Sequence, residues 1–433
     1  MSTRPRRSLL LVCHVTPPTT MSAARRAGAL TKHLARLGHS VAVLTSVAWG
    51  SGAIPGAALT VRTRDLLSSR LNWRRAGIAA LKGDSGGGAP MAPSILARWV
   101  VPDLEMLGWT PFALLAARRL AAERRIDCVI TSSPPASAHL VGVALQLRGV
   151  PWVADLRDGW RFESLRPRAA LASLDALDER LERLVVERAD AVCAVTQPIA
   201  DDLQARYARP VATITNGFDP EEATGAGTAA DSAAEGLLDG RRRSLVHTGT
   251  LAYGGRPLAP LLHGLTALAA RAPEVASRLE VVLAGPVTDA ERAEVRAAGL
   301  ESTVRFTGPV SHATSLALQR SADCLLVLTG PGQTGVATGK LYEYLSAGRP
   351  ILVIGDETAA ARIVADAGAG LVVGRDDRAA LAGALRRLVE RPGDLPAATR
   401  DAAARFSYPV LAERMASLVE EAILGRTERR AGR

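Results

Sequence analysis

The strongest constraint on the fold is an alternation of short apolar runs with stretches of helical periodicity, which occurs twice along the 433 residues. Such an alternation is typical of parallel sheets that carry helices on both faces. In the first half the predicted strands are residues 8–15, 40–46, 127–132, 151–156, 191–196 and 211–215. In the second half they are residues 244–249, 279–285, 304–308, 324–330, 351–355 and 370–374. The sequence therefore predicts an α/β protein with two Rossmann-like, doubly wound domains.

A stretch without apolar periodicity separates the two halves. Residues 216–243 are rich in Ala, Gly, Thr and acidic side chains, which is typical of a linker with a disordered loop. We expect an N-terminal domain at 1–215, a C-terminal domain at 244–405, and a last helix at 406–433 that can cross back to the first domain. Residues 48–108 show no clear pattern, and we expect them to form an irregular zone that includes a mobile surface loop.

The amino-acid composition limits the classes of molecule that we expect this protein to bind. The 53 basic and 43 acidic side chains give a net charge of +10, but the basic surplus is scattered arginine. Aromatic residues make up 4% of the chain, which leaves few side chains for stacking on bases, so no nucleic-acid partner is predicted. The richness in Ala and Arg indicates a bacterial genome of high GC content.

The cysteines and the apolar runs of the sequence indicate in which cellular compartment we expect the protein. The four cysteines lie in or beside apolar runs without CxxC spacing, which predicts buried, reduced thiols: Cys13, Cys128, Cys193 and Cys324. No apolar run reaches the length of about 18 residues that a membrane-spanning helix needs. We therefore expect a cytoplasmic protein whose membrane contact is at most peripheral.

The stretch "TGKLYEYLSAGRPILVIG" contains one of the three lysines in a chain of 50 arginines. Thr338 predicts an N-cap and Gly348 the end of a short helix. Lys340 in the first turn adds a compact positive charge to the helix amides, and the two together suit a phosphate group. Glu343 lies on the same face, where its carboxylate can accept hydrogen bonds from two ribose hydroxyls.

The same spacing also fits a surface ion pair between Lys340 and Glu343. Such a pair would be served equally well by arginine, which this chain uses almost everywhere. The rarity of lysine therefore favours the phosphate interpretation.

The pattern "TGKLYEYLSAGRPIL", together with "VADLRDGW" and "HTGTLAYGGRP", resembles the retaining glycosyltransferases of family 4, and the similarity extends over nearly the whole chain. The resemblance implies the GT-B fold, in which two Rossmann-like domains face each other across a cleft. It implies transfer of a sugar from a nucleoside-diphosphate sugar with retention of anomeric configuration. It also implies that no cofactor and no metal ion is required.

The resemblance assigns donor-binding positions in the second half. It implies that Glu343 holds the nucleotide ribose and that Arg256 and Lys340 lie near the diphosphate. Two positions depart from the family pattern, since Gly335 stands where many relatives carry a glutamate and Thr250 where they often carry an arginine. The full predicted donor set is Gly249, Thr250, Arg256, Gly335, Val336, Lys340, Leu341 and Glu343.

In the first half, "DLRDGW" follows a predicted strand and places Asp155, Arg157 and Asp158 close together. These residues can form a self-neutralising cluster that fixes the loop, or they can face the reacting groups. By the resemblance, Arg157 falls where many relatives have a histidine. The predicted catalytic residues are Arg157, Asp158, Arg256 and Lys340. The predicted acceptor-binding residues are Pro18, Thr19, Ser133 and Trp160.

The sequence thus predicts a glycosyltransferase that uses a nucleoside-diphosphate sugar and a small-molecule, lipid or glycan acceptor. Two alternatives stay open: a noncatalytic sugar-nucleotide-binding partner of an active transferase, and a GT-B sugar-nucleotide epimerase. Gly335 is the residue that keeps the noncatalytic alternative open. A dinucleotide oxidoreductase is disfavoured, because no GxGxxG motif follows the first predicted strand.

Overall fold

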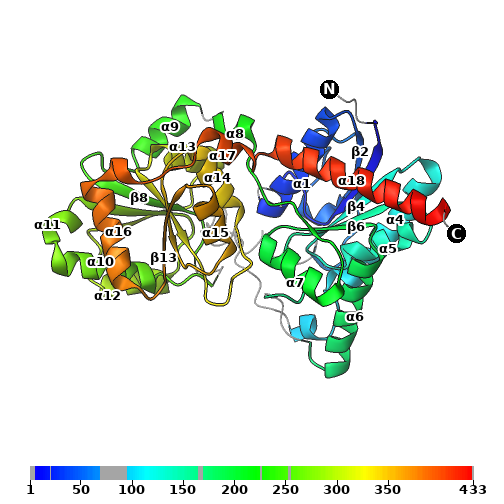
Figure 1. Ribbon diagram of the computed structural model, residues 1–433, viewed down its shortest axis with the longest axis horizontal. Helices are drawn as coiled ribbons and strands as arrows, with labels where there is room; N and C mark the ends of the chain where they lie inside the picture. The colour runs from blue at the N-terminus through cyan, green and yellow to red at the C-terminus, as the bar shows by residue number, and fades with distance from the viewer. Residues whose placement is uncertain are drawn as a thin grey trace. The chain divides into compact units, whose positions relative to one another are not determined.

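Each of the two predicted halves forms its own sheet in the computed structural model of the protein (Figure 1). The structure describes residues 5–19, 21–68, 95–163, 169–224, 227–251 and 255–431. Within these ranges, unit 1 comprises residues 5–215 and 408–431, and unit 2 comprises residues 216–407. The predicted α/β class and the twelve predicted strands are confirmed.

Unit 1 contains a parallel sheet of seven strands within its described residues, in the order β3-β2-β1-β4-β5-β6-β7. The strands are β1 (Ser8–Cys13), β2 (Ser40–Ser46), β3 (Leu59–Thr63), β4 (Cys128–Ser133), β5 (Trp152–Leu156), β6 (Ala191–Ala194) and β7 (Ala212–Thr213). The helices are α1 (Ser22–Arg36), η1 (Val47–Trp49), η2 (Ile95–Arg98), α3 (Glu105–Gly108), α4 (Thr110–Glu123), α5 (Ala138–Gln146), α6 (Ala172–Arg188), α7 (Gln197–Tyr207) and α18 (Tyr408–Ala431).

Unit 2 contains a parallel sheet of six strands within its described residues, in the order β10-β9-β8-β11-β12-β13. The strands are β8 (Arg243–Thr248), β9 (Leu279–Ala284), β10 (Val304–Gly308), β11 (Cys324–Leu328), β12 (Ile351–Ile354) and β13 (Gly370–Val373). The helices are α8 (Pro220–Thr224), α9 (Thr228–Glu235), α10 (Ala259–Arg271), α11 (Pro273–Ala276), α12 (Asp289–Ala297), α13 (His312–Ser321), α14 (Gly339–Ala347), α15 (Ala359–Asp366), α16 (Arg378–Glu390), η4 (Pro392–Asp394) and α17 (Arg400–Ala404).

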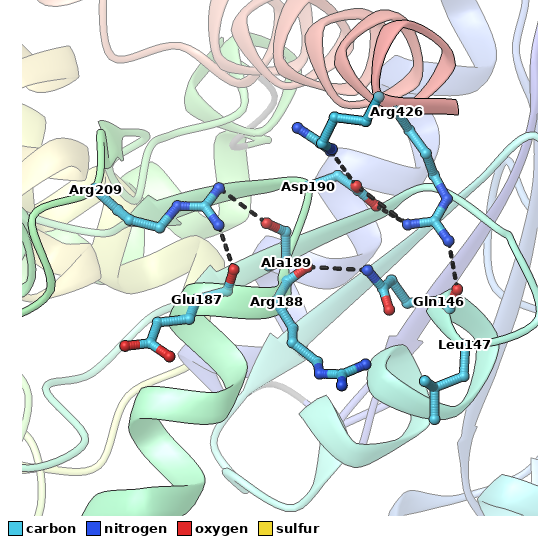
Figure 2. A pocket seen from close by; sticks show the side chains of 9 residues that line it. Gln146, Leu147, Glu187, Arg188, Ala189, Asp190, Arg209 and Arg426 are labelled. Atoms are coloured by element: carbon cyan, nitrogen blue, oxygen red, sulfur yellow. Dashed lines mark hydrogen bonds and ion pairs between the residues drawn. The ribbon is translucent and has the colours of Figure 1, made fainter. Parts of the chain in front are cut away.

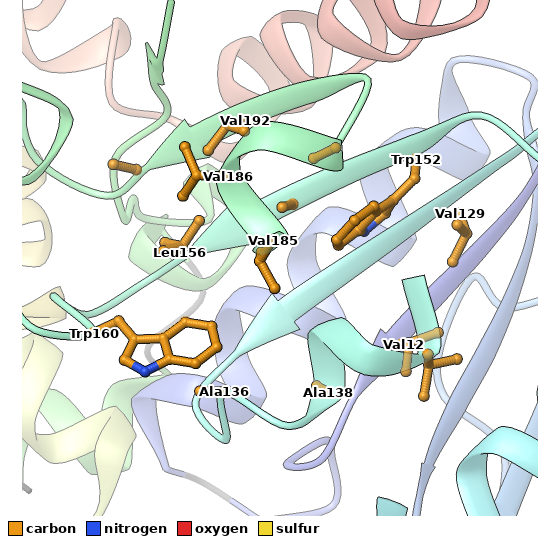
Figure 3. Close-up of a cluster of buried hydrophobic side chains, with 14 of the residues drawn as sticks. Val12, Val129, Ala136, Ala138, Trp152, Leu156, Trp160, Val185, Val186 and Val192 are labelled. Carbon is orange, nitrogen blue, oxygen red and sulfur yellow. The ribbon is translucent and has the colours of Figure 1, made fainter. Parts of the chain in front are cut away.

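Both faces of each sheet are buried, which explains why the strands are continuous apolar runs. In β1, Leu10 and Val12 belong to one core cluster, whereas Leu9 and Leu11 belong to the cluster on the opposite face. Figure 3 shows part of the first cluster, which includes Trp152 of β5 together with Val185 and Val186 of α6. Burial on both faces is typical of parallel sheets covered by helices.

The last helix, α18, packs on unit 1, although unit 2 precedes it in the chain. Figure 1 shows α18 alongside α1, and its apolar side chains join the core of unit 1 through Leu411, Met415 and Val419. An ion pair between Arg7 and Glu420, 2.6 Å from nitrogen to oxygen, ties this helix to the segment before β1. The chain therefore passes between the units twice, after Thr215 and after Ser407.

The expectation of a disordered linker at 216–243 is wrong for the described residues of that segment. They form α8 and α9 and the start of β8, and Ala234 of α9 is fully buried in the core of unit 2. Arg320 of α13 donates to the carbonyl of Ala223 at 3.0 Å and to the carboxylate of Asp231 at 2.9 Å. These contacts order a segment whose composition alone gives no apolar periodicity.

The irregular zone expected at 48–108 contains a strand that the sequence did not reveal. β3 pairs with β2 from Leu59 to Thr63 at the edge of the sheet, and its first four residues are only half-buried. Residues 69–94, with the predicted loop "KGDSGGGAP", lie outside the described residues. The four cysteines are free and buried, and no described helix is long and apolar enough to cross a membrane.

A buried histidine in unit 1 makes stability depend on pH. His139 is fully buried, its Nδ1 lies 2.7 Å from the hydroxyl of Thr131, and burial lowers its pKa to about 4. The unfolded chain, with a histidine pKa of about 6.5, binds the proton more readily, so this contribution is complete above pH 6.5 and is lost towards pH 4.

We therefore predict that the stability difference between the wild type and His139→Gln shrinks by about 2 kcal/mol between pH 8 and pH 5. Urea unfolding of both proteins at the two pH values measures this difference. A difference that stays constant across this range would contradict the neutral, buried state of His139.

Candidate functional site

The order of the strands in unit 2 reverses between β8 and β11. From β8 the sheet continues to β9 and β10, and from β11 it continues the other way to β12 and β13. The loops after two such strands diverge at the carboxyl edge, which is where open α/β sheets bind ligands. Gly249, Thr250 and Arg256 follow β8, whereas Gly335 and Val336 lie between β11 and α14.

The two loops contact each other through glycines. A Cβ added to Gly330 would lie 2.4 Å from the carbonyl oxygen of Gly255, so a side chain cannot be accommodated there. Arg256 follows directly and donates to the carbonyl of Thr250 at 3.4 Å. Its guanidinium is half-buried, and this burial lowers its pKa from the ordinary value. The close approach holds Arg256 beside the loop that leads to α14.

Lys340 extends from the first turn of α14 across the end of β8. Thr338 is the N-cap of α14 and Gly348 its C-cap, as the sequence predicted. A Cβ added to Gly249 would lie 1.9 Å from the Nζ of Lys340 and 2.2 Å from its Cε, which shows how closely the lysine side chain crosses this glycine. Gly249 also has a φ of 124°, a backbone conformation that favours glycine.

Glu343 lies one turn further along α14 and is held by a buried network. Its carboxylate accepts a hydrogen bond from Nε2 of Gln319 at 3.2 Å, and the same nitrogen lies 3.0 Å from the hydroxyl of Thr248. The backbone N–H of Thr248 donates to the hydroxyl of Tyr344 at 2.8 Å. Only 8% of Glu343 is exposed, so its carboxylate is not solvated as it would be in a surface ion pair.

The charges of Lys340 and Arg256 converge near His247 of β8. Burial, together with the charges of the two nearby cations, lowers the pKa of His247 to about 3. Its Nδ1 lies 3.0 Å from the carbonyl oxygen of Leu326, so this nitrogen carries the proton and donates it. The imidazole is therefore neutral, and the positive charge at this edge comes from Lys340 and Arg256.

Leu341 differs from the other predicted donor residues. Its side chain is fully buried in the core of unit 2, and its backbone N–H donates to the carbonyl of Thr338 at 3.0 Å. The sequence assigned Leu341 to donor binding because of its place in the motif. The structure corrects this, since Leu341 packs α14 onto the sheet.

Unit 1 has its own reversal of strand order, between β1 and β4. Pro18 and Thr19 follow β1, and Ser133 ends β4, so these predicted acceptor residues come from neighbouring strands at one edge. Asp158 follows β5, the next strand along, and its side chain is exposed. The structure thus brings Pro18, Thr19, Ser133 and Asp158 to the carboxyl edge of one sheet.

The first aspartate of the "DLRDGW" motif, Asp155, is held in place by an arginine of α1. Asp155 is fully buried and pairs with Arg26 of α1 at 2.9 Å, while the hydroxyl of Ser132 donates to it at 2.7 Å. Burial by itself would raise the pKa of Asp155, but the Arg26 charge and these hydrogen bonds lower it below its ordinary value. The carboxylate of Asp155 is therefore fully engaged by Arg26 and Ser132, and it does not face a substrate.

Arg157 also binds the protein itself. Its guanidinium is 7% exposed and donates to the carbonyl oxygens of Ser133 at 2.7 Å, Pro134 at 3.1 Å and Ala23 at 3.2 Å. The prediction that Arg157 faces the reacting sugar is corrected by these contacts. Its position makes it a support for the loop after β4.

Trp160 was assigned to the acceptor, but it lies in the core of unit 1. It is 4% exposed, its indole N–H donates to Asp178 at 2.9 Å, and its ring stacks on His139 with centroids 6.1 Å apart. A side chain with this burial and a satisfied donor packs the core. The structure therefore removes Trp160 from the acceptor set.

Sequence reasoning missed two polar groups at the same edge of unit 1. One is Arg26, which has no motif around it and pairs with a residue 129 positions away. The other is His14, directly after β1, whose Nε2 donates to Asp65 at 2.6 Å while its Nδ1 accepts from Trp49 at 3.3 Å. The place of His14, directly after a predicted strand, could have indicated a site residue. Asp65 lies in the zone 48–108, where the sequence shows no clear pattern.

Within the described residues, no group of three His, Cys, Asp or Glu side chains lies close enough together to hold a metal ion.

Comparison with known proteins agrees with this arrangement. The family model for Glycosyltransferase Family 4 matches residues 23–222, and the model for Glycosyl transferases group 1 matches residues 248–391. A phosphatidyl-myo-inositol mannosyltransferase from Mycolicibacterium smegmatis is 34% identical over 158 residues. That match covers 36% of this chain and 39% of the relative, so the chain spans well under half of the relative's length.

Solved structures share the fold over nearly the whole chain. A sucrose-phosphate synthase from Thermosynechococcus elongatus superposes with a TM-score of 0.63 at 18% identity, covering 95% of this chain and 98% of the other. HepE from Anabaena, solved in complex with UDP and glucose, also gives 0.63 at 16% identity, covering 95% and 99%. The chain is therefore a glycosyltransferase that belongs to family 4 and has the GT-B fold.

Proposed function

We propose that this glycosyltransferase takes its sugar from a nucleoside-diphosphate sugar that binds at the carboxyl edge of unit 2. The observation that carries the proposal is the path of Lys340, which leaves the first turn of α14 and crosses Gly249. There the lysine charge, the half-buried Arg256 and the N-terminal amides of α14 meet at the strand-order reversal. The related HepE was solved with UDP and with UDP-glucose, which supports this class of donor.

In this proposal each group has a distinct role. Lys340 and Arg256 stabilise the negative charge that grows on the departing diphosphate, where preorganised charge is most effective. Glu343 accepts hydrogen bonds from the ribose hydroxyls, because Gln319 already fixes the orientation of its carboxylate. Gly335 has no side chain, so the donor sugar meets backbone amides of the loop before α14 at this position.

The acceptor is proposed to bind unit 1 near Pro18, Thr19, Ser133 and Asp158. The bond between the anomeric carbon and the phosphate oxygen breaks, and the acceptor atom bonds to the same face of the sugar. The proton of the acceptor passes to an oxygen of the departing diphosphate, so configuration is retained and no metal is required. The proposed acceptor is a small molecule, a lipid or a glycan.

Nucleotide binding is tested by thermal unfolding with nucleoside diphosphates. A diphosphate at a hundred times its Kd stabilises the protein by about 2.7 kcal/mol. Loss of one charged hydrogen bond to phosphate costs about 1.5–3 kcal/mol, so Lys340→Ala is expected to raise the Kd by about 10- to 100-fold. Lys32→Ala, in α1 of unit 1, is the matched control and should leave the Kd unchanged.

The ribose contact is tested in the same assay with Glu343→Gln. This change keeps the shape of the side chain but removes the charge that strengthens two hydrogen bonds, so nucleoside diphosphates should lose affinity while inorganic pyrophosphate should not. An undiminished response to nucleoside diphosphates in both Lys340→Ala and Glu343→Gln would remove these two assignments.

The crossing of Lys340 over Gly249 gives a second prediction. In Gly249→Ala the added methyl group would collide with Nζ and Cε of Lys340, so the lysine must move and the Kd for a nucleoside diphosphate should rise by about tenfold. Gly299→Ala is the control, because Gly299 also has a positive φ, 67°, but nothing lies within 4 Å of an added Cβ. Both variants lose stability, and only Gly249→Ala should lose affinity.

Turnover separates the proposed transferase from the two alternatives. Purified protein, incubated with a nucleoside-diphosphate sugar and a panel of acceptors, should release the nucleoside diphosphate and form a glycoside. The anomeric proton signal of the product should show the same configuration as the donor. Binding without turnover would point to a noncatalytic partner, and conversion of the donor into its epimer would point to an epimerase.

A further inference from the structure

A pocket of unit 1 lies at the sheet edge opposite to the one described above. It has a volume of about 620 Å³ and sits at the amino ends of β5 and β6, between the last turns of α5, α6 and α18 (Figure 2). Four arginines line it: Arg188, Arg209, Arg426 and Arg429. The acidic residues in its lining are Asp190 and Glu187. The pocket is therefore separate from the strand ends to which the donor and acceptor are assigned.

Asp190 fixes two of these arginines. Its carboxylate is 2% exposed and accepts a hydrogen bond from the backbone N–H of Trp152 at 2.9 Å. Arg426 lies 3.3 Å from the same carboxylate, and Arg429 forms a second ion pair with it. Both arginines come from α18, so one buried acid orients two guanidinium groups on the pocket wall. One of their two positive charges is left without a matching negative charge.

Arg426 and Arg209 bind backbone carbonyls as well. Arg426 donates to the carbonyl of Gln146 at 2.6 Å, and Arg209 donates to the carbonyl of Ala189 at 3.1 Å and to that of Glu187 (Figure 2). Carbonyl oxygens satisfy N–H groups but carry no net charge. Arg209 therefore keeps its full positive charge in a fixed orientation.

The other acid does not offset this surplus. The Glu187 carboxylate lies 4.0 Å from Arg183, one turn earlier on α6, and in Figure 2 it points away from the arginines. Arg188 is exposed, and no hydrogen bond or ion pair of its guanidinium is found within the described residues. Four guanidinium groups thus share one carboxylate, Asp190, around a pocket large enough for a small ligand.

An apolar side chain lies beside these charges. Leu147 follows α5, lines the same pocket and is 66% exposed. We propose that this pocket binds a phosphate-bearing anion, either the headgroup phosphate of a lipid or a soluble phosphomonoester. The guanidinium fork matches the geometry of phosphate oxygens, and Leu147 offers contact to the carbon atoms attached to the phosphate.

The test uses the full chain and two kinds of probe. Co-sedimentation with phosphatidylglycerol vesicles, against phosphatidylcholine vesicles, detects a lipid source, and calorimetric titration with glycerol 3-phosphate detects a soluble one. The double variant Arg188→Gln and Arg429→Gln keeps Arg426 with Asp190, so the wall of the pocket is preserved. Since each surface arginine contributes about fivefold in affinity for anionic headgroups, the double variant should bind about 25-fold more weakly.

A double variant with the same change in charge serves as the control. Arg118→Gln and Arg124→Gln lie on or just after α4, where both side chains are exposed, and they should retain wild-type binding. Binding to anionic vesicles alone assigns the pocket to a lipid headgroup, and binding of glycerol 3-phosphate alone assigns it to a soluble ligand. Absence of binding to both probes, or an equal loss in the control variant, overturns the proposal.

This site is independent of the proposed donor site. The Arg188→Gln and Arg429→Gln variant leaves unit 2 unchanged, so its thermal stabilisation by nucleoside diphosphates should equal that of the wild type. A failed vesicle test with intact nucleotide binding therefore rejects the pocket proposal without affecting the proposed function.

Discussion

The crossing of Lys340 over Gly249 is the contact on which the rest of the proposed donor site depends. It requires that the residue directly after β8 have no side chain, and Gly249 meets this requirement with a φ of 124°. It also requires that α14 be fixed against β8, which the hydrogen bond from the N–H of Thr248 to Tyr344 achieves at 2.8 Å. Because Glu343 belongs to the same helix and the same buried network, the cation and the carboxylate are positioned by one set of contacts.

The neutral state of His247 follows from this arrangement. A third positive charge beside Lys340 and Arg256 would be costly in a buried position, and burial together with those two charges lowers the pKa of the imidazole to about 3. Because His247 is neutral, Lys340 and Arg256 are not repelled by a third positive charge beside them. His247 therefore adds no charge to the site in the neutral pH range.

The fold could be predicted from the sequence because the sheets are buried on both faces, which makes each central strand a continuous apolar run. The limits of α14 could also be predicted, since Thr338 and Gly348 are strong end signals. β3 escaped prediction because it is an edge strand whose residues are mostly half-buried. The helices at 220–235 escaped because contacts from α13, and not apolar periodicity, order them.

The position of the candidate site residues in the fold was predictable only for some motif residues. Glu343 and Lys340 are held at the carboxyl edge as the motif predicts. Trp160 and Leu341 lie in equally recognisable motifs, but their side chains pack the core. Arg26 carries no local signal, because its pairing with Asp155 joins α1 to a strand that follows more than a hundred residues later. Long-range pairing of buried charges cannot be read from spacing.

The buried contacts of unit 1 also bear on the proposed route of the proton. His14 lies at the carboxyl edge, but its Nε2 donates to Asp65 and its Nδ1 accepts from Trp49, so both ring nitrogens are occupied. His139 is fully buried beneath the same edge, where solvent and ligand cannot reach it. Asp155 is committed to Arg26. In the described part of unit 1, these three groups are unsuited to act as a general base. Asp158 is exposed at the same edge, so its carboxylate competes with the diphosphate oxygen as the proposed acceptor of the proton.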